Sequence, residues 1–382
     1  MQFLLQAKNA HEVPSYQPAR RERSRPVFVG SGWWDEVVDL TRQFVGDHML
    51  AIVVDDEVER LYPERLRAVY DALPRVRTMH LRGGEEAKQF SVAQEIHEFL
   101  MQNELQKDDL LMTVGGGTIG DVTGFVASTY MRGLQWIFVP TTLVMQADCA
   151  VGGKTAVNLG SYKDYCGTFY WPNVVFVDTS FLKTLPDKHF RNAIPEIAKV
   201  AMIGSEELFR KLCARVANGG GLAGARSSVE EFVQPSLAIL TNVIKLDPFQ
   251  QDLRIVLQMG HTTAYALESA SKLHLNHGEA VGIGLAFESY LAVQQGLMSA
   301  QDRKALIDLF ENCGLSAALP SELQDRLLVD SMRHEKRNRG RSVQMVLPCT
   351  PGRGVEEWPA PMVSFTPDEI WHALAAYRQE CA

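Results

Sequence analysis

The chain contains, at residues 115–121, the stretch Gly-Gly-Gly-Thr-Ile-Gly-Asp. The apolar run Asp109–Val114 before it predicts a buried strand, and the pattern Val122–Tyr130 after it predicts a helix. Glycines let a backbone approach a phosphate, and the first N–H groups of the following helix favour an anion. The stretch predicts a nucleotide pyrophosphate site. A tight strand-to-helix turn without a ligand is the alternative, because the usual Gly-x-Gly-x-x-Gly spacing is absent.

Further strands and helices alternate around this stretch. Helical patterns at Tyr62–Ala72 and Ser91–Asn103 separate short apolar runs, which end at Asp, Gly or Pro residues. Alternation of this kind predicts an α/β, Rossmann-like domain with a parallel sheet covered by helices. The other predicted strands are Met49–Val54, Arg75–Leu81, Gln135–Val139 and Asn173–Val177.

The sequence changes character near residue 185, and the second half is mostly helical with one late strand at Val343–Leu347. We therefore predict three parts: a polar N-terminal extension at 1–26, an α/β domain at 27–185, and an α-helical domain at 186–382. The predicted helices are Glu196–Ile203, Glu207–Ala217, Val229–Lys245, Leu253–Leu273, Gly278–Gln295 and Ala300–Asn312, with a loop at Gly219–Gly221.

Composition narrows the class of protein. The 382 residues carry a formal charge of −8, which argues against a general nucleic-acid binder. No stretch approaches the ~18 apolar residues of a membrane helix, and the start of the chain lacks the order of a signal peptide. The six cysteines are scattered without a Cys-x-x-Cys pair. We expect a cytoplasmic protein with reduced thiols and no membrane partner.

One carboxylate and two imidazoles are candidate metal ligands: Glu196, His261 and His277. Such a set suits zinc or cobalt and leaves positions open for substrate oxygens. The spacing is not local, so caps or satisfied core residues remain the alternative for the two histidines. Asp55 and Asp56, at the end of a predicted strand, could bind ribose hydroxyls or form a turn.

Several cations stand in glycine-rich or motif-like contexts. Together they would suit a phosphorylated substrate, although each taken alone is an ordinary solvated charge. They are Arg132, Lys154, Lys163, Lys199, Arg254 and Lys336.

Long motifs in a fixed order carry a resemblance to a known family. Besides the glycine stretch, they are Tyr130-Met131-Arg132-Gly133, Gly152-Gly153-Lys154-Thr155-Ala156-Val157-Asn158, Pro195-Glu196-Ile197-Ala198-Lys199, Gly260-His261-Thr262 and His277-Gly278-Glu279-Ala280-Val281. From about Gly83 to Pro348 the chain resembles the dehydroquinate synthase-like sugar-phosphate cyclases. The resemblance implies NAD in the α/β domain and a divalent metal, usually Zn²⁺ with Co²⁺ as an option, in the helical domain.

The resemblance also implies roles for individual residues. Glu196, His261 and His277 match the metal ligands, and the catalytic positions are Lys154, Asp148, Lys199, Arg254 and Tyr265. The substrate phosphate would meet Arg132, typically from a dimer partner, together with Lys154, Asp164, Gln258 and Lys336. The positions expected at the cofactor are Asp55, Glu85, Lys88, Gly115, Gly116, Gly117, Asp121, Thr141, Thr142 and Lys163.

Four departures from the dehydroquinate synthase pattern bear on the substrate. Tyr265 replaces a second histidine, Gln258 and Asp164 replace asparagines, and Leu240 replaces a lysine that helps an arginine hold the substrate carboxylate. Aspartate near a phosphate is unfavourable unless it is protonated or paired with a cation such as Lys163. Losing the lysine favours a substrate without that carboxylate.

The resemblance implies a homodimeric, phosphate-eliminating carbon–oxygen lyase that cyclises a phosphorylated sugar by transient oxidation, β-elimination, reduction, ring opening and aldol closure. Sedoheptulose 7-phosphate, in cyclitol biosynthesis, is the favoured substrate. The alternatives are a 3-dehydroquinate synthase, a metal-dependent polyol dehydrogenase and a non-catalytic homologue.

Overall fold

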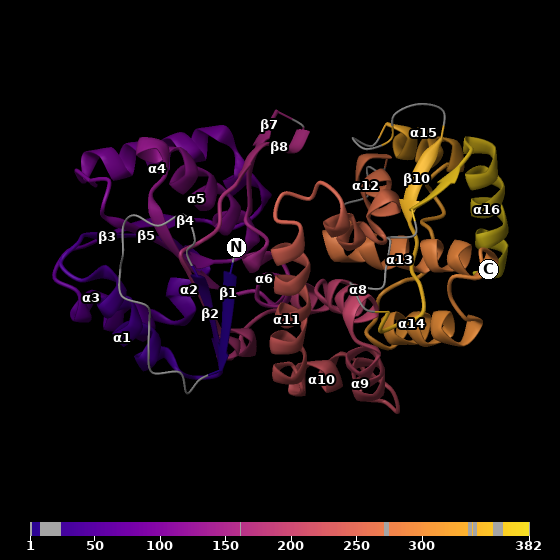
Figure 1. Cartoon of the computed structure of the whole chain (residues 1–382), viewed down its shortest axis with the longest axis horizontal. Helices are drawn as coiled ribbons and strands as arrows, with labels where there is room; N and C mark the ends of the chain where they lie inside the picture. Colours follow the sequence, from indigo (N-terminus) through magenta and orange to yellow (C-terminus); the bar gives the residue numbers. More distant parts are fainter. Residues whose placement is uncertain are drawn as a thin grey trace. The chain divides into compact units, whose positions relative to one another are not determined.

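The computed structural model describes residues 2–7, 24–160, 162–270, 275–334, 338, 342–353 and 362–381. Contacts between Cα atoms divide the chain into two units, Met1–Leu185 and Pro186–Ala382. In Figure 1, unit 1 runs from indigo to magenta and unit 2 from magenta to yellow. Each unit is described by itself.

Unit 1 is built on a seven-stranded sheet in the order β1-β2-β9-β6-β5-β3-β4, in which every neighbouring pair is parallel. The predicted parallel sheet is therefore confirmed. Its central strands are continuous apolar runs because helices cover both faces. The strands are β1 Gln2–Ala7, β2 Ser24–Gly30, β3 Leu50–Asp55, β4 Val76–Leu81, β5 Leu110–Gly115, β6 Gln135–Pro140 and β9 Val174–Asp178.

The strand order reverses at β3, which pairs with β4 on one side and β5 on the other. In open parallel sheets, ligands bind beyond the carboxyl ends of the strands at such a reversal. The helical segments are α1 Trp34–Val45, α2 Asp56–Leu61, α3 Pro63–Ala72, η1 Glu85–Lys88, α4 Phe90–Gln102, α5 Gly117–Thr129, η2 Tyr130–Arg132, α6 Leu143–Ala147, η3 Cys149–Val151 and η4 Thr179–Lys183.

Two parts of unit 1 differ from the sequence prediction. The prediction of a polar extension at 1–26 is wrong for Gln2–Ala7, which forms β1, and for residues 24–26, which begin β2 and pair with β1. Composition does not reveal this pairing because a parallel edge strand is joined through main-chain hydrogen bonds. The antiparallel hairpin of β7 Lys154–Leu159 and β8 Tyr162–Phe169 was not predicted either. Polar residues interrupt β7 at Lys154, Thr155 and Asn158, and β8 is largely exposed, so no apolar run marks either strand.

Unit 2 is mostly helical, as predicted, and its late strand β10 Val343–Val346 pairs antiparallel with β11 Met362–Phe365. One predicted helix, Leu253–Leu273, is wrong as a single element. It divides into η5 Leu253–Gln258 and α12 His261–Ala270, because Gly260 adopts a left-handed φ of +80° between them. Likewise Gly221, predicted as loop, begins α10.

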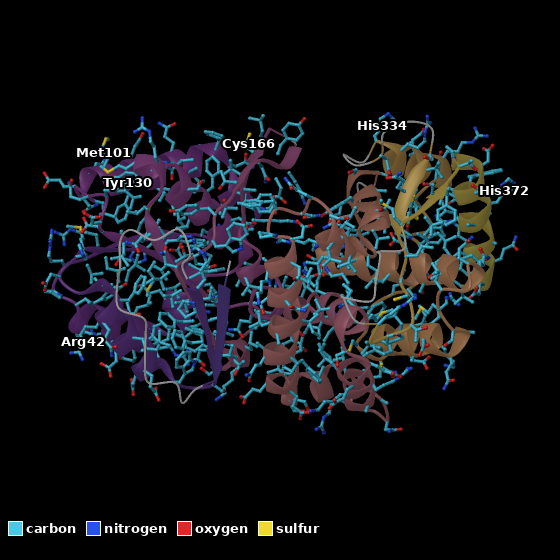
Figure 2. All side chains as sticks on the ribbon, in the orientation of Figure 1. Arg42, Met101, Tyr130, Cys166, His334 and His372 are labelled. Carbon is cyan, nitrogen blue, oxygen red and sulfur yellow. The ribbon has the colours of Figure 1, made fainter. Side chains whose placement is uncertain are left out.

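The remaining helices of unit 2 are α7 Asp187–Arg191, α8 Ile194–Gly204, α9 Glu206–Val216, α10 Gly221–Ser227, α11 Glu230–Leu246, α13 His277–Gln294, α14 Ala300–Asn312, α15 Asp325–Arg333 and α16 Pro367–Glu380. Within the described ranges, none of these helices has the length and apolar character needed to cross a bilayer. All six cysteines are free thiols, and Figure 2 labels one of them, Cys166 on β8.

Candidate functional site

The carboxyl ends of β3 and β5 meet the turn after β4 at one edge of the sheet in unit 1. Asp55 closes β3, Gly115 closes β5, and Gly83 lies just beyond β4. A Cβ atom on Gly83 would stand 2.5 Å from the Asp55 Oδ2 atom, so glycine is needed for this approach. Burial raises the pKa of Asp55. This edge of the sheet therefore has glycine backbone without side chains next to one partly buried carboxylate, Asp55. Such a carboxylate can accept hydrogen bonds from the hydroxyl groups of a ribose.

The helix α5 begins at Gly117, directly behind this edge. Its capping residue is Gly116, which has no side chain to occupy the first N–H groups of the helix. Thr141 donates its N–H to the Gly115 carbonyl at 3.0 Å, and Thr142 flanks Gly116. The predicted glycine, threonine and aspartate positions thus lie together. Bare backbone at a helix N-terminus fits the pyrophosphate of a dinucleotide.

A buried polar network lies between η1, α5 and the β7–β8 hairpin. The Lys88 ammonium donates to Asp121 at 2.8 Å and to Asp164. The backbone N–H of Asp164 donates to Asn158 Oδ1 at 3.0 Å, and the Asn158 side-chain amide donates to Glu85 at 2.7 Å. Burial alone would lower the pKa of Lys88, but the two carboxylates raise it above its usual range. Lys88 is therefore a permanent cation held by two acids.

Asp164 obtains its cation from Lys88, whereas the sequence analysis suggested Lys163. Lys163 is exposed on β8, and Asp164 has a positive φ of 52°, a conformation that aspartate tolerates better than most residues. The negative charge at a position where the family has asparagine is thus neutralised within unit 1. The network therefore pairs Asp164 with a cation of the same unit.

The remaining predicted residues of unit 1 are more exposed. Lys154 begins β7 and lines a small cavity with Asp121 and Cys149. Asp148 lies half-buried between α6 and η3. Arg132 is exposed at the end of η2, with a positive φ of 63°.

Unit 2 brings together the three predicted metal ligands. The His277 Nε2 atom lies 3.2 Å from Glu196 Oε1, and the His261 Nε2 atom lies 3.5 Å from the same oxygen. One donor atom from each residue falls within 4.8 Å of the others. Glu196 and His261 are buried, and His277 is half-exposed. The set fits a divalent metal, because a carboxylate oxygen and two imidazole nitrogens face one point.

Hydrogen bonds orient both imidazoles through their other nitrogen. The His277 Nδ1 atom lies 2.9 Å from Glu268 Oε1, and the His261 Nδ1 atom lies 3.0 Å from the Met259 carbonyl oxygen. Since both partners accept, each Nδ1 is the nitrogen that donates, and each Nε2 is the nitrogen that faces Glu196 and the candidate metal position. Lys199 forms an ion pair with Glu196 through Oε2, which leaves Oε1 facing the histidines.

The charges around Glu196 agree with this assignment. Burial by itself would raise the pKa of Glu196, but Lys199 and the two imidazoles hold it well below its usual range. Burial, reinforced by Lys199, lowers the pKa of His261 to about 3, so this imidazole is neutral. Burial disfavours the cation of His277 too, but Glu196 and Glu268 raise its pKa to about 10. A metal would therefore displace a proton from His277.

Tyr265, one of the departures, packs on both histidines. Its ring centroid lies 5.4 Å from that of His261 and 6.4 Å from that of His277. Arg254 and Gln258 are buried on η5, and the Arg254 Nη1 atom donates to the Pro248 carbonyl at 2.6 Å. Leu240 is buried within α11. The predicted Lys336 falls outside the described residues.

Two functional neighbours were missed by the sequence analysis. Asn158 belongs to one of the motifs quoted above, but its role was not predicted. Its hydrogen bond to Glu85 joins residues that are 73 positions apart in the chain, and a second bond joins it to Asp164. Glu268 could have been found, because His261, Tyr265 and Glu268 follow the i, i+4, i+7 spacing of one helix face.

Two known protein families match most of the chain. The 3-dehydroquinate synthase N-terminal family matches residues 78–192, and the 3-dehydroquinate synthase C-terminal family matches residues 193–338. The 3-dehydroquinate synthase of Dehalococcoides mccartyi is 33% identical over 332 residues, covering 86% of this chain and 91% of the relative. That of Symbiobacterium thermophilum is 33% identical over 363 residues, covering 94% and 99%.

Solved structures show the same fold. The 2-epi-5-epi-valiolone synthase ValA of Streptomyces hygroscopicus, with NAD⁺ and Zn²⁺ bound, superposes with a TM-score of 0.82 at 26% identity, covering 96% of this chain and 99% of ValA. A 2-deoxy-scyllo-inosose synthase with carbaglucose-6-phosphate, NAD⁺ and Co²⁺ superposes with a TM-score of 0.78 at 22% identity, covering 92% and 96%.

Proposed function

Because this chain belongs to the dehydroquinate synthase-like family of cyclases, we propose that it is an NAD- and metal-dependent lyase that cyclises a phosphorylated ketose with loss of phosphate. Sedoheptulose 7-phosphate is the favoured substrate, and cyclitol biosynthesis is the favoured setting. The observation that carries the choice is Leu240, an apolar, buried residue at the position where the family holds a substrate carboxylate with lysine.

Leu240 belongs to an apolar stretch of α11. Leu237, Val243 and Ile244 on the same helix are buried with it. A carboxylate placed near this face would find hydrocarbon in place of one of the two cations that hold it in the family, and the less compensated charge would be costly. Sedoheptulose 7-phosphate carries no such carboxylate, so the apolar face does not penalise its binding.

Tyr265 supports the same choice. A tyrosine cannot act as the imidazole it replaces, and its ring packs against both candidate metal ligands. This changes the surroundings of the proposed metal without removing a ligand. The pattern favours altered specificity over loss of the centre.

The residues divide the proposed work between them. Glu196, His261 and His277 would hold the metal, and Asp55 with Gly115–Gly117 would hold the ribose and pyrophosphate of NAD. When bound, NAD supplies reversible hydride acceptance and the metal supplies Lewis acidity for the reacting oxygens. Lys154 and Arg132 would meet the substrate phosphate, and Lys199 keeps Glu196 ionised.

The second candidate is a 3-dehydroquinate synthase. It is favoured by the names of relatives at 33% identity that span nearly the whole chain. In that case Leu240, Tyr265, Gln258 and Asp164 would be tolerated replacements. Four changes at positions that the family resemblance assigns to the substrate should reduce transition-state binding, so we rank this candidate second.

The test is phosphate release by purified protein loaded with NAD and Zn²⁺. The panel contains sedoheptulose 7-phosphate, the shikimate heptulosonate phosphate and glucose 6-phosphate. We expect release with sedoheptulose 7-phosphate and little with the heptulosonate. Efficient release with the heptulosonate alone would replace our substrate by that of a dehydroquinate synthase.

The same assay separates the other classes. A polyol dehydrogenase would accumulate NADH in proportion to product, whereas a cyclase regenerates NAD in each turnover. A non-catalytic homologue would release no phosphate from any sugar.

We also propose a cytoplasmic homodimer. The β7–β8 hairpin exposes Leu159, Tyr165 and Phe169, and Phe90 is exposed at the start of α4. A second copy of the chain would remove these side chains from water. Light scattering at two protein concentrations tests the dimer, and a monomer at both would contradict it.

A further inference from the structure

Unit 2 contains a buried acidic side chain that is not one of the three candidate metal ligands. Glu288 lies in the middle of α13 and is fully buried. Its Oε2 atom accepts the Gly260 N–H at 2.6 Å. Its Oε1 atom accepts the N–H of Thr263 at 3.1 Å and the hydroxyl of the same residue at 3.0 Å. A buried carboxylate is costly unless its oxygens are bonded, as they are here.

These donors surround His261, the first residue of α12. The opening N–H groups of a helix have no partner within the helix, and its dipole favours a negative charge there. Glu288 therefore holds the start of the helix that carries one candidate metal ligand. The other candidate, His277, begins α13, the helix to which Glu288 itself belongs.

The contact between the two helices is close. A Cβ atom on Gly284 would collide with the Gly260 carbonyl oxygen, so the backbone that precedes α12 rests directly on α13. Glu288 lies one turn beyond Gly284. The backbone contact at Gly284 and the hydrogen bonds of Glu288 together set the distance between His261 and His277.

One peptide group links Glu288 to the His261 ring. The Met259–Gly260 peptide donates its N–H to Glu288, and its carbonyl oxygen accepts from His261 Nδ1 at 3.0 Å. Hydrogen bonds in such a chain polarise one another, so the carboxylate makes this carbonyl a better acceptor. A stronger bond at Nδ1 makes Nε2 a better metal ligand. His277 has the same support directly, from Glu268.

We propose that Glu288 is a positioning residue of the metal centre, acting on His261 through the Met259–Gly260 peptide. The proposal rests on the metal site of the proposed function and not on its substrate. Each candidate imidazole is then supported by a carboxylate at its Nδ1 side. For His277 the carboxylate is Glu268, bonded directly, and for His261 it is Glu288, bonded through one peptide group.

The experiment measures Co²⁺ binding to the full-length chain, without sugar phosphate, by titration and by the visible spectrum of the bound ion. Glu288→Gln keeps the shape and removes the charge. We expect Co²⁺ affinity to fall about 10- to 100-fold, as for other residues that support a ligand, with an altered spectrum. Ser289→Ala is the matched control, because Ser289 is equally buried and donates to Ala286 within α13.

A second variant separates the peptide link from general packing. Thr263→Val removes one donor to Glu288 and leaves the Met259–Gly260 peptide intact. We expect its Co²⁺ affinity to stay within about threefold of wild type, well short of the loss at Glu288. Equal losses in Glu288→Gln and Thr263→Val would overturn the peptide link. If Glu288→Gln does not fold, Glu288→Asp, which withdraws the carboxylate from Gly260, must show the loss instead.

Unchanged affinity and spectrum in a folded Glu288 variant would overturn the proposal, even if its melting temperature fell. A wild-type chain that binds no Co²⁺ would overturn both this proposal and the metal site. Failure of the sugar assay with Co²⁺ binding intact would affect only the proposed substrate.

Discussion

The two polar clusters of this molecule balance their charges in opposite ways. In unit 1 a buried cation, Lys88, is held by two carboxylates, Asp121 and Asp164. In unit 2 a buried carboxylate, Glu196, is held by Lys199 and faces the Nε2 atoms of two imidazoles, His261 and His277. The first cluster is satisfied by the protein itself, whereas the second presents a donor set that a divalent cation would complete. The difference shows that charges can be balanced within the cluster itself or left for an added cation to balance.

Removing a metal ligand should produce the largest effect. His261→Ala takes one donor from a set of three, so we expect Zn²⁺ affinity to fall by more than about 100-fold, beyond the loss expected for a supporting residue. Metal content after dialysis and phosphate release measure it. His372→Ala, on an exposed position of α16, is the control. Full Zn²⁺ occupancy in His261→Ala would remove the distinction between the clusters.

Removing the cation of unit 1 should mainly lower stability. Lys88→Met leaves Asp121 and Asp164 without their shared partner, and because these two carboxylates are 27% and 56% exposed we expect a loss of about 2 kcal/mol, less than for a fully buried pair. Chemical denaturation measures the free energy of unfolding. The control is Lys304→Met, whose ion pair with Asp308 is exposed, and it should change that free energy by less than about 1 kcal/mol. Equal effects would show that the network is not a stabilising element.

Unit 2 also contains a carboxylate that accepts hydrogen bonds from the protein backbone, and a third variant tests its contribution to stability. Asp247 accepts the N–H groups of Gln251, Asp252 and Arg254 in the segment before η5. Burial works against the anion, but these bonds lower its pKa. A lowered carboxyl pKa stabilises the fold above its unfolded value of 3.8, and that contribution is lost as pH falls through the lower folded value.

Asp247→Asn should therefore reduce the free energy of unfolding by about 1–2 kcal/mol at neutral pH. Wild type and variant should converge only below about pH 4, where the wild-type carboxylate takes up its proton. Denaturation curves at several pH values measure the difference. A constant difference across the whole range would contradict the assigned cause.

The smallest effect is expected at Asp164, whose side chain is 56% exposed. Asp164→Asn removes a negative charge beside Lys88, so binding of the anionic NAD should tighten by a few-fold, less so at high salt. A fluorescence titration at two salt concentrations measures it. Glu64→Gln, an exposed carboxylate on α3, should leave NAD binding unchanged. Weaker binding in Asp164→Asn would show that the carboxylate orders the hairpin more than it repels the ligand.

Regular patterns were predictable from the sequence, and the irregular ones were not. The buried strands β3 and β5 appear within one residue of their predicted ends, because parallel strands covered on both faces are continuous apolar runs. The β7–β8 hairpin has no such run. The break at Gly260 was missed because the apolar pattern continues across it while the backbone turns left-handed.

The candidate site was predictable as a set of residues but not as an arrangement. Glu196, His261 and His277 came from motif resemblance, and their spacing in the chain carries no information on distance. Lys88 was expected at the cofactor, yet nothing in the sequence indicated that it would neutralise Asp164 across 76 residues. Glu288 could not be found at all, because a glutamate in an apolar helix reveals its partners only once the helices are packed.

Sequence alone determined the class of fold, the order of its parts and the chemical types of the site residues. These depend on local periodicity and on side-chain identity, which each residue carries with it. Only the tertiary structure decided which charges meet, which imidazole nitrogen is left for a metal, and which buried carboxylate supports the ligands. Hydrogen bonds and ion pairs act over about 3 Å, and the packing of distant segments alone sets such distances.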